Sequence, residues 1–128
     1  MQGSRCLGFM HLKSYKELKV WQRSIELVKE TYEVSQQFPK NELYGLSIQM
    51  RRAAVSIPSN IAEGQLRKNL KEYLQFLRIA YSSTAELETQ IIIARDLYPE
   101  IKYNQLENLL LEVQKMLNVM ISKLEART

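Results

Sequence analysis

Hydrophobic residues recur three or four positions apart in four segments of this 128-residue chain. That spacing places them along one side of an α-helix, so it predicts four amphipathic helices packed around a common core. The positions expected to face that core, segment by segment, are Leu18, Trp21, Ile25, Val28 and Tyr32; Leu43, Leu46, Met50, Ala53, Ile57 and Ile61; Leu70, Leu74, Leu77, Tyr81, Thr84, Leu87, Ile91 and Ala94; and Leu106, Leu110, Val113, Leu117, Met120 and Leu124.

Three capping boxes indicate where helices begin. In Ser14–Glu17, Asn69–Glu72 and Asn104–Glu107, a hydrogen-bonding side chain precedes a glutamate by three residues. The first side chain of such a box accepts from a free amide of the first turn, and the glutamate reaches back. We therefore expect the first, third and fourth helices to start at these boxes.

Proline and glycine indicate where helices end. A residue before proline is pushed out of the α region, so the first helix should end before Phe38-Pro39 and the third near Tyr98-Pro99. The second helix should run from Asn41 or Glu42 to Gly64, a typical C-terminal stop. The fourth should continue to the C-terminus.

Short connections make consecutive helices antiparallel, so the pattern predicts an all-α, up-down-up-down four-helix bundle. We expect residues 13–128 to form this single domain, preceded by a flexible lead of residues 1–12. Hydrophobic residues make up 45% of the chain and charged residues 25%, as in soluble globular proteins. No apolar run is long enough to span a membrane, so we expect a cytoplasmic protein.

The second predicted helix contains a proline in its interior. Pro58 removes a hydrogen bond and clashes with the carbonyl four residues back, at a cost of about 3 kcal/mol. Ser56, Ser59 and Asn60 surround it and could bond the freed backbone groups. The segment therefore indicates a structural kink, which either shapes the bundle alone or serves a neighbouring site.

A second apolar line runs along the first helix. Val20, Leu27 and Val34 are seven residues apart and lie roughly 130° around the helix from the expected core side, at about 100° per residue. One reading is a wide core stripe with scattered exposed apolar residues. We favour the other, in which these residues form a subunit interface.

Positive charge is concentrated in two parts of the chain. The formal net charge is +4, and the excess lies near the N-terminus and between residues 51 and 78. Such a patch would attract polyanions. The residues we expect to contact phosphates are Arg51, Arg52, Arg67, Lys68, Lys71 and Arg78, followed by Lys16, Lys19 and Arg23. The alternatives are a solvated face or, for the first helix, ion pairs with another helix or subunit.

Catalytic and metal-binding residues are scarce. The single histidine, His11, and the single cysteine, Cys6, both fall in the expected lead. Without them, histidine acid–base chemistry, a Cys–His nucleophile and most transition-metal sites are excluded. We therefore expect no enzyme, no cofactor and no metal.

Five segments carry a family resemblance: Leu18–Ser24, Phe38-Pro39, Leu43–Leu46, Arg51–Gly64 and Ala85–Gln90. They resemble the four-helix-bundle proteins encoded by intervening sequences in 23S ribosomal RNA genes, over roughly residues 13–125. The resemblance implies a homopentamer. It also points to related accessory variability determinants of diversity-generating retroelements, which are basic pentamers that bind nucleic acid and a reverse transcriptase. It implies no catalytic residues.

Together these expectations describe a non-enzymatic homo-oligomer that binds structured RNA or RNA–DNA through clustered Arg and Lys, mainly at phosphates. Two alternatives remain open. One is a protein adaptor that docks a reverse transcriptase. The other is a purely structural oligomer whose charges pair across subunits.

Overall fold

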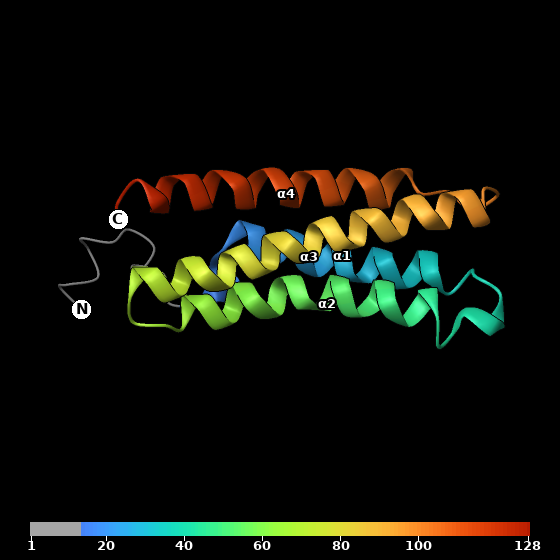
Figure 1. Cartoon of the computed structure of the whole chain (residues 1–128), viewed down its shortest axis with the longest axis horizontal. Coiled ribbons are helices and arrows are strands. Elements are labelled where there is room, and N and C mark those ends of the chain that lie inside the picture. Colours follow the sequence, from blue (N-terminus) through green and yellow to red (C-terminus); the bar gives the residue numbers. More distant parts are fainter. Residues whose placement is uncertain (1–13) are drawn as a thin grey trace.

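The computed structural model describes residues 14–128, which form four α-helices joined by short connections (Figure 1). No strand occurs in this range, so the all-α class and the four-helix bundle are confirmed. None of the described helices is long and apolar enough to cross a membrane. The helices are α1 (Lys19–Ser35), α2 (Leu46–Gln65), α3 (Leu70–Leu97) and α4 (Asn104–Glu125), with two short 3₁₀ turns, η3 (Tyr15–Glu17) and η4 (Lys40–Glu42).

Each helix packs against two others. α1 contacts α2 and α4, while α3 contacts α2 and α4, and the most extensive contact joins α2 to α3. Three side-chain pairs between α3 and α4 run in opposite order along the two helices. A residue later in α3 contacts a residue earlier in α4. The pairs are Arg78–Glu125, Glu88–Gln114 and Arg95–Glu107.

The capping boxes have different outcomes. Asn69 caps α3 as expected, because its side chain accepts from the Glu72 amide at 2.8 Å. Ser14 accepts from the Lys16 amide, but this bond begins only η3, and α1 itself starts after Leu18. Asn104 is already inside α4, and Tyr103 precedes the helix without a capping side chain. α1 therefore starts later than expected, whereas α4 starts at Asn104 as expected but without the predicted side-chain cap.

The start of α2 depends on a carboxylate rather than on a capping box. α2 begins at Leu46, later than expected, because residues 40–42 form η4 instead. Glu42 accepts from the Leu46 amide at 3.1 Å and from the Tyr98 hydroxyl. The Tyr98 ring also stacks on Phe38, with 5.2 Å between centroids. Glu42 thus joins the α1–α2 connection to the end of α3.

The expectation for the two apolar lines of α1 was wrong. Val20, Leu27 and Val34, expected at a subunit interface, are buried in the core of the single chain. The expected core line is partly exposed instead: Trp21, Ile25 and Val28 are half-buried, and Tyr32 is 44% exposed.

Two hydroxyl side chains explain why the line of Val20, Leu27 and Val34 faces the core. Ser24 and Thr31 lie between the buried apolar residues and make that side of α1 look polar in the sequence. Each hydroxyl donates to a carbonyl of its own helix at 2.7 Å, Ser24 to Trp21 and Thr31 to Leu27. Because the hydroxyls are satisfied locally, both residues can be fully buried.

Gly64 brings α2 and α3 close together. It lies inside the last turn of α2, where a helix stop had been expected. A Cβ atom at this position would lie 2.9 Å from Phe76 Cβ and from Tyr73 Cδ1, and 3.2 Å from the Tyr73 carbonyl oxygen. Only glycine therefore allows this approach.

We expect Gly64→Ala to lower the free energy of unfolding by about 1–3 kcal/mol, as overpacking of a well-packed core typically does. Urea denaturation measures this change. Ser59→Ala, at an exposed position of the same helix, is the matched control. A stabilised Gly64→Ala protein, as alanine's higher helix propensity alone would give, would contradict the close approach.

The Glu42 contacts predict a dependence of stability on acid pH. The hydrogen bond from Tyr98, and then that from the Leu46 amide, hold the pKa of Glu42 below its ordinary value of 4.5. A carboxylate with a lowered pKa stabilises the fold above its unfolded pKa and loses that contribution as the pH falls through the folded pKa. Glu42→Gln should therefore lower Tm at neutral pH and weaken the decline of Tm below pH 4.5. Thermal unfolding across pH tests this, with Glu86→Gln as the exposed control.

Candidate nucleic-acid interface

One end of the bundle gathers basic residues from α1, α3 and α4 and from the segments beside them. At this end α2 leads into α3, α1 begins and α4 ends (Figure 1). The basic residues there outnumber the acidic ones. We call this the basic end; its bases are Lys16, Lys19, Arg67, Lys68, Lys71, Arg78, Lys123 and Arg127, and its acids are Glu17, Glu63, Glu72 and Glu125.

The opposite end has no such excess of positive charge. Its bases and acids nearly balance, with Lys40, Arg51, Arg52, Arg95 and Lys102 against Glu30, Glu33, Glu42, Asp96, Glu100 and Glu107. The eight bases and four acids of the basic end give it a formal charge of +4, whereas the other residues of the range 14–128 carry more acids than bases. A polyanion approaching the molecule would be attracted to that end.

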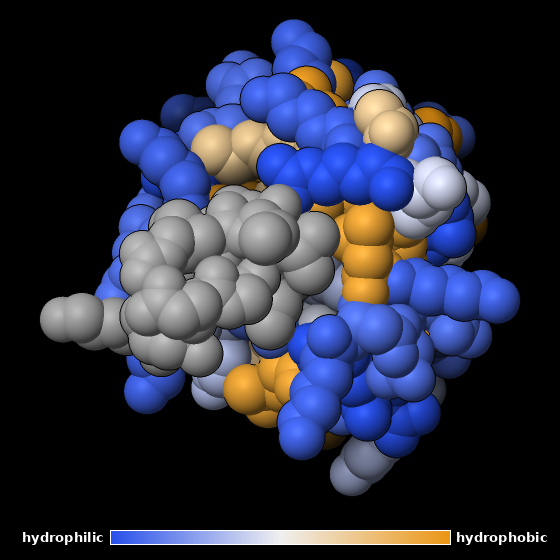
Figure 2. Space-filling model, turned by 90° about the vertical axis from the view of Figure 1, so that its left-hand side faces the viewer, coloured by the Kyte–Doolittle hydropathy of each residue, from blue (hydrophilic) through white to orange (hydrophobic). Residues whose placement is uncertain are grey.

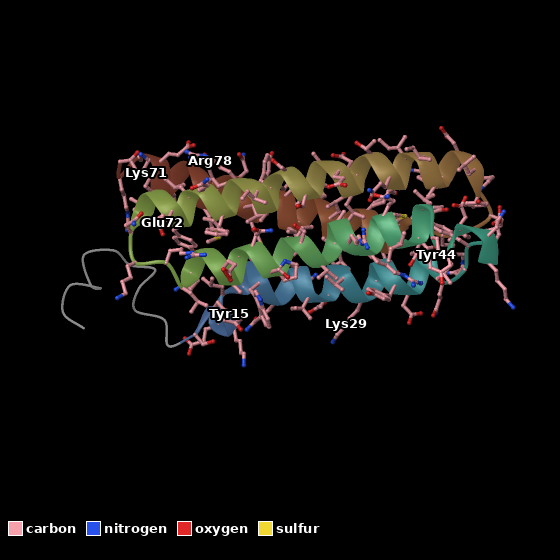
Figure 3. All side chains as sticks on the ribbon, turned by 60° about the horizontal axis from the view of Figure 1, so that its bottom comes forward. Tyr15, Lys29, Tyr44, Lys71, Glu72 and Arg78 are labelled. Atoms are coloured by element: carbon pink, nitrogen blue, oxygen red, sulfur yellow. The ribbon has the colours of Figure 1, made fainter. Side chains whose placement is uncertain are left out.

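Figures 2 and 3 show the layout of the basic end. Seen along the bundle, hydrophilic residues cover most of the described surface, with small hydrophobic areas between them (Figure 2). From the side, Lys71 and Arg78 follow one another along α3, and Tyr15 lies at the same end on the α1 side (Figure 3). Lys29 and Tyr44 lie farther along the bundle.

Two of the expected phosphate contacts lie elsewhere. Arg52 precedes Gly64 by three helical turns, about 18 Å at about 1.5 Å per residue, so Arg51 and Arg52 do not join the basic end. Arg51 donates its Nε to Ser35 Oγ at 2.8 Å, and its guanidinium lies 4.7 Å from the centre of the Tyr32 ring. Arg51 thus has a structural role between α2 and α1.

Arg23 is held by carboxylates of the same chain. It donates through Nε and Nη2 to both Glu112 oxygens, at 3.0 and 2.7 Å, and through Nη1 to Glu26 at 2.6 Å. The hydrogen bond from Arg23 lowers the pKa of Glu112 and raises that of Arg23. Arg23 of α1 therefore makes an ion pair with another helix, which was the alternative considered for the bases of α1.

Arg67 and Arg78 are only partly engaged. Arg67 pairs with Glu63 at 3.0 Å and lies 4.7 Å from the Phe76 ring centre, and Arg78 pairs with Glu125 at 2.6 Å. Each pair uses one of the nitrogens of a guanidinium, which carries five N–H donors. Both residues therefore keep donors for a further oxygen.

Four lysines at the basic end are available for a ligand. The side chains of Lys16, Lys19, Lys68 and Lys71 are exposed and make no ion pair or hydrogen bond within residues 14–128. Lys68 lies in the α2–α3 connection and Lys71 in the first turn of α3, while Lys16 and Lys19 flank the start of α1. The basic end thus joins two groups that are distant in sequence.

The proline segment has a structural role. α2 continues unbroken through Pro58. Asn60 Nδ2 donates to the Ser56 carbonyl at 2.8 Å and to Ser56 Oγ at 3.0 Å, and Ser56 Oγ bonds Ser83 Oγ of α3 at 2.8 Å. Ser59 instead lies at the exposed α1–α2 side. Ser56 and Asn60 thus form a polar connection from α2 to Ser83 of α3.

Sequence reasoning missed Lys123 and Arg127. Lys123 lies in the last turn of α4 and Arg127 just after the helix, in a part of the sequence without an excess of bases. The contact between Arg78 and Glu125 places this part of α4 beside the start of α3. An antiparallel helix pair, taken together with the charges near its ends, was the signal that could have identified them.

The described residues contain no cluster of His, Cys, Asp and Glu able to hold a metal ion. His11 and Cys6 lie outside residues 14–128. The candidate site is a charged surface at one end of a helical bundle.

The described residues thus form a four-helix bundle with one basic end. Residues 16–119 match the family described as 23S rRNA-intervening sequence protein, and the chain belongs to that family. No curated protein matches it significantly.

Proposed function

We propose that this protein is a non-enzymatic, homo-oligomeric, cytoplasmic nucleic-acid-binding protein whose basic end contacts the phosphates of structured RNA or RNA–DNA. The observation that carries the proposal is the convergence on one end of the bundle of Lys16, Lys19, Lys68 and Lys71, which make no ion pair within residues 14–128. Membership of a family named for a ribosomal RNA intervening sequence supports an RNA partner.

The expected contacts follow from which bases are free. Lys16, Lys19, Lys68 and Lys71 would contact phosphates directly. Arg67 and Arg78 would add the donors that their carboxylate partners leave open. Such contacts neutralise phosphate charge and position the protein, but they do not read base sequence.

Self-association would increase the affinity. One basic end offers few contacts, and several copies on one RNA would act together through their effective concentration. We propose that the up-down-up-down bundle is the repeating unit of a homo-oligomer, with the pentamer implied by the family resemblance as its expected size.

The test is fluorescence anisotropy of a labelled structured RNA titrated with the purified protein at several salt concentrations. The double variant Lys68→Ala/Lys71→Ala should bind more weakly and show a shallower dependence of log K on log salt, by about 0.7–0.9 for each phosphate contact removed. Lys40→Ala/Lys102→Ala removes the same charge from the opposite end and should leave both quantities nearly unchanged.

Two results would contradict the proposal. Equal weakening by both double variants would mean that binding follows net charge and not the basic end. Absence of binding at about 50 mM salt, a condition that favours phosphate contacts, would remove the nucleic-acid function and favour the adaptor or structural alternative.

A further inference from the structure

The connection between α2 and α3 carries an arginine whose guanidinium is fixed in place. Arg67 lies over the Phe76 ring of α3, with 4.7 Å between its Cζ atom and the ring centre. Its Nη2 atom donates to Glu63 of α2 at 3.0 Å. Its backbone amide donates to the Gly64 carbonyl at 3.0 Å. Both helices therefore hold this one side chain.

The ring beneath the guanidinium is itself held by the packing of α2 on α3. Phe76 is half-buried, and its Cβ atom lies only 2.9 Å from the place that a Cβ atom on Gly64 would take. No side chain therefore separates Phe76 from the α2 backbone. The stack of Arg67 on Phe76 is part of the fold, and a surface that is ordered before binding loses little entropy when a ligand arrives.

The outer part of Arg67 is open to solvent. Its Nε atom is buried, whereas the side chain as a whole is 41% exposed, so the guanidinium turns Nε inward and presents the rest outward. Leu66, the preceding residue of the same connection, is 69% exposed although its side chain is apolar. The tip of the connection thus offers a flat cation and an apolar side chain on adjacent residues.

Free positive charge follows directly along the chain. Lys68 is the next residue, and Lys71 lies three residues later in the first turn of α3, at the end of the bundle in Figure 3. Both side chains are exposed and make no ion pair within residues 14–128. A nucleotide has the matching parts, which are a flat base and a phosphate on either side of it.

Guanidinium planes are among the surfaces on which proteins stack RNA bases. The guanidinium is planar and only weakly hydrated, so it can lie on an aromatic ring with one face and on a base with the other. Within a duplex, neighbouring bases cover both faces of a base. Only a base in a loop, a bulge or a single-stranded end can be splayed out to stack on a protein side chain.

We propose that the outer face of the Arg67 guanidinium stacks on an unpaired base of the bound RNA, with Phe76 supporting the guanidinium from behind. Leu66 lies beside the base, and Lys68 and Lys71 hold the phosphates next to it. This inference rests on the phosphate-binding function proposed above and adds the class of RNA. Because every base has a flat face, the stack selects unpaired RNA over paired RNA and does not read a sequence.

The test compares two RNA hairpins that differ only in the loop. One has ordinary loop nucleotides, and the other has abasic ribose at every loop position, so that stem, ends and phosphates are the same. By fluorescence anisotropy, the wild-type full chain should bind the abasic-loop hairpin about tenfold more weakly, because the stacked base is missing. The dependence of log K on log salt should be the same for both, since the phosphates are unchanged.

Arg67→Lys keeps the positive charge but removes the plane. This variant should bind both hairpins with nearly equal affinity and with the salt dependence of the wild type. Arg95→Lys is the matched control, because Arg95 also pairs with a carboxylate, Glu107 at 2.6 Å, but lies at the opposite end of the bundle. It should keep the wild-type preference. Circular dichroism verifies the helicity of both variants, and the wild-type comparison needs neither of them.

The outcomes separate this inference from the function on which it rests. Equal, salt-dependent binding of both hairpins by the wild type would leave the phosphate-binding function intact and overturn the stacking. A preference for the ordinary loop that persists in Arg67→Lys, or that Arg95→Lys loses equally, would overturn Arg67 as the stacking residue. Absence of binding to either hairpin at about 50 mM salt would overturn both proposals.

Discussion

The close packing of α2 against α3 is the constraint on which the rest of the molecule depends. Gly64 removes the side chain that would keep the two backbones apart, and Ser56 and Ser83 bond across the same interface. The chain reverses between these two helices within the short connection of residues 66–69. That reversal places Arg67 and Lys68 at the very end of the bundle, and the first turn of α3 adds Lys71 beside them.

Buried hydroxyl groups fix the rotation of α1 in the same way. Ser24 and Thr31 satisfy their hydroxyls within the helix, so this side of α1 can enter the core with Val20, Leu27 and Val34. On another side of the helix, Trp21 and Ile25 remain at the surface and line the groove between α1 and α2. The burial of this side of α1 thus determines which apolar side chains of the helix are exposed to a partner.

The capping-box motif was sufficient to predict the cap at Asn69, and hydrophobic periodicity was sufficient to predict four helices. It was insufficient to choose between two apolar lines on α1, because periodicity does not reveal that Ser24 and Thr31 bond their own carbonyls. The clustering of charge along the sequence also grouped Arg51 and Arg52 with Lys68 and Lys71, although most of α2 separates the two pairs. Lys123 became part of the candidate interface only when α4 was seen beside α3.

The most direct measurement of the central claim is a lysine footprint: acetylation of the folded protein, with and without bound structured RNA, read at each lysine by mass spectrometry. If the basic end binds phosphates, Lys16, Lys19, Lys68 and Lys71 should become protected, while Lys40 and Lys102 at the opposite end should react as before. Protection of Lys40 and Lys102, or equal protection of all six, would contradict a phosphate-binding surface at the end where α2 meets α3.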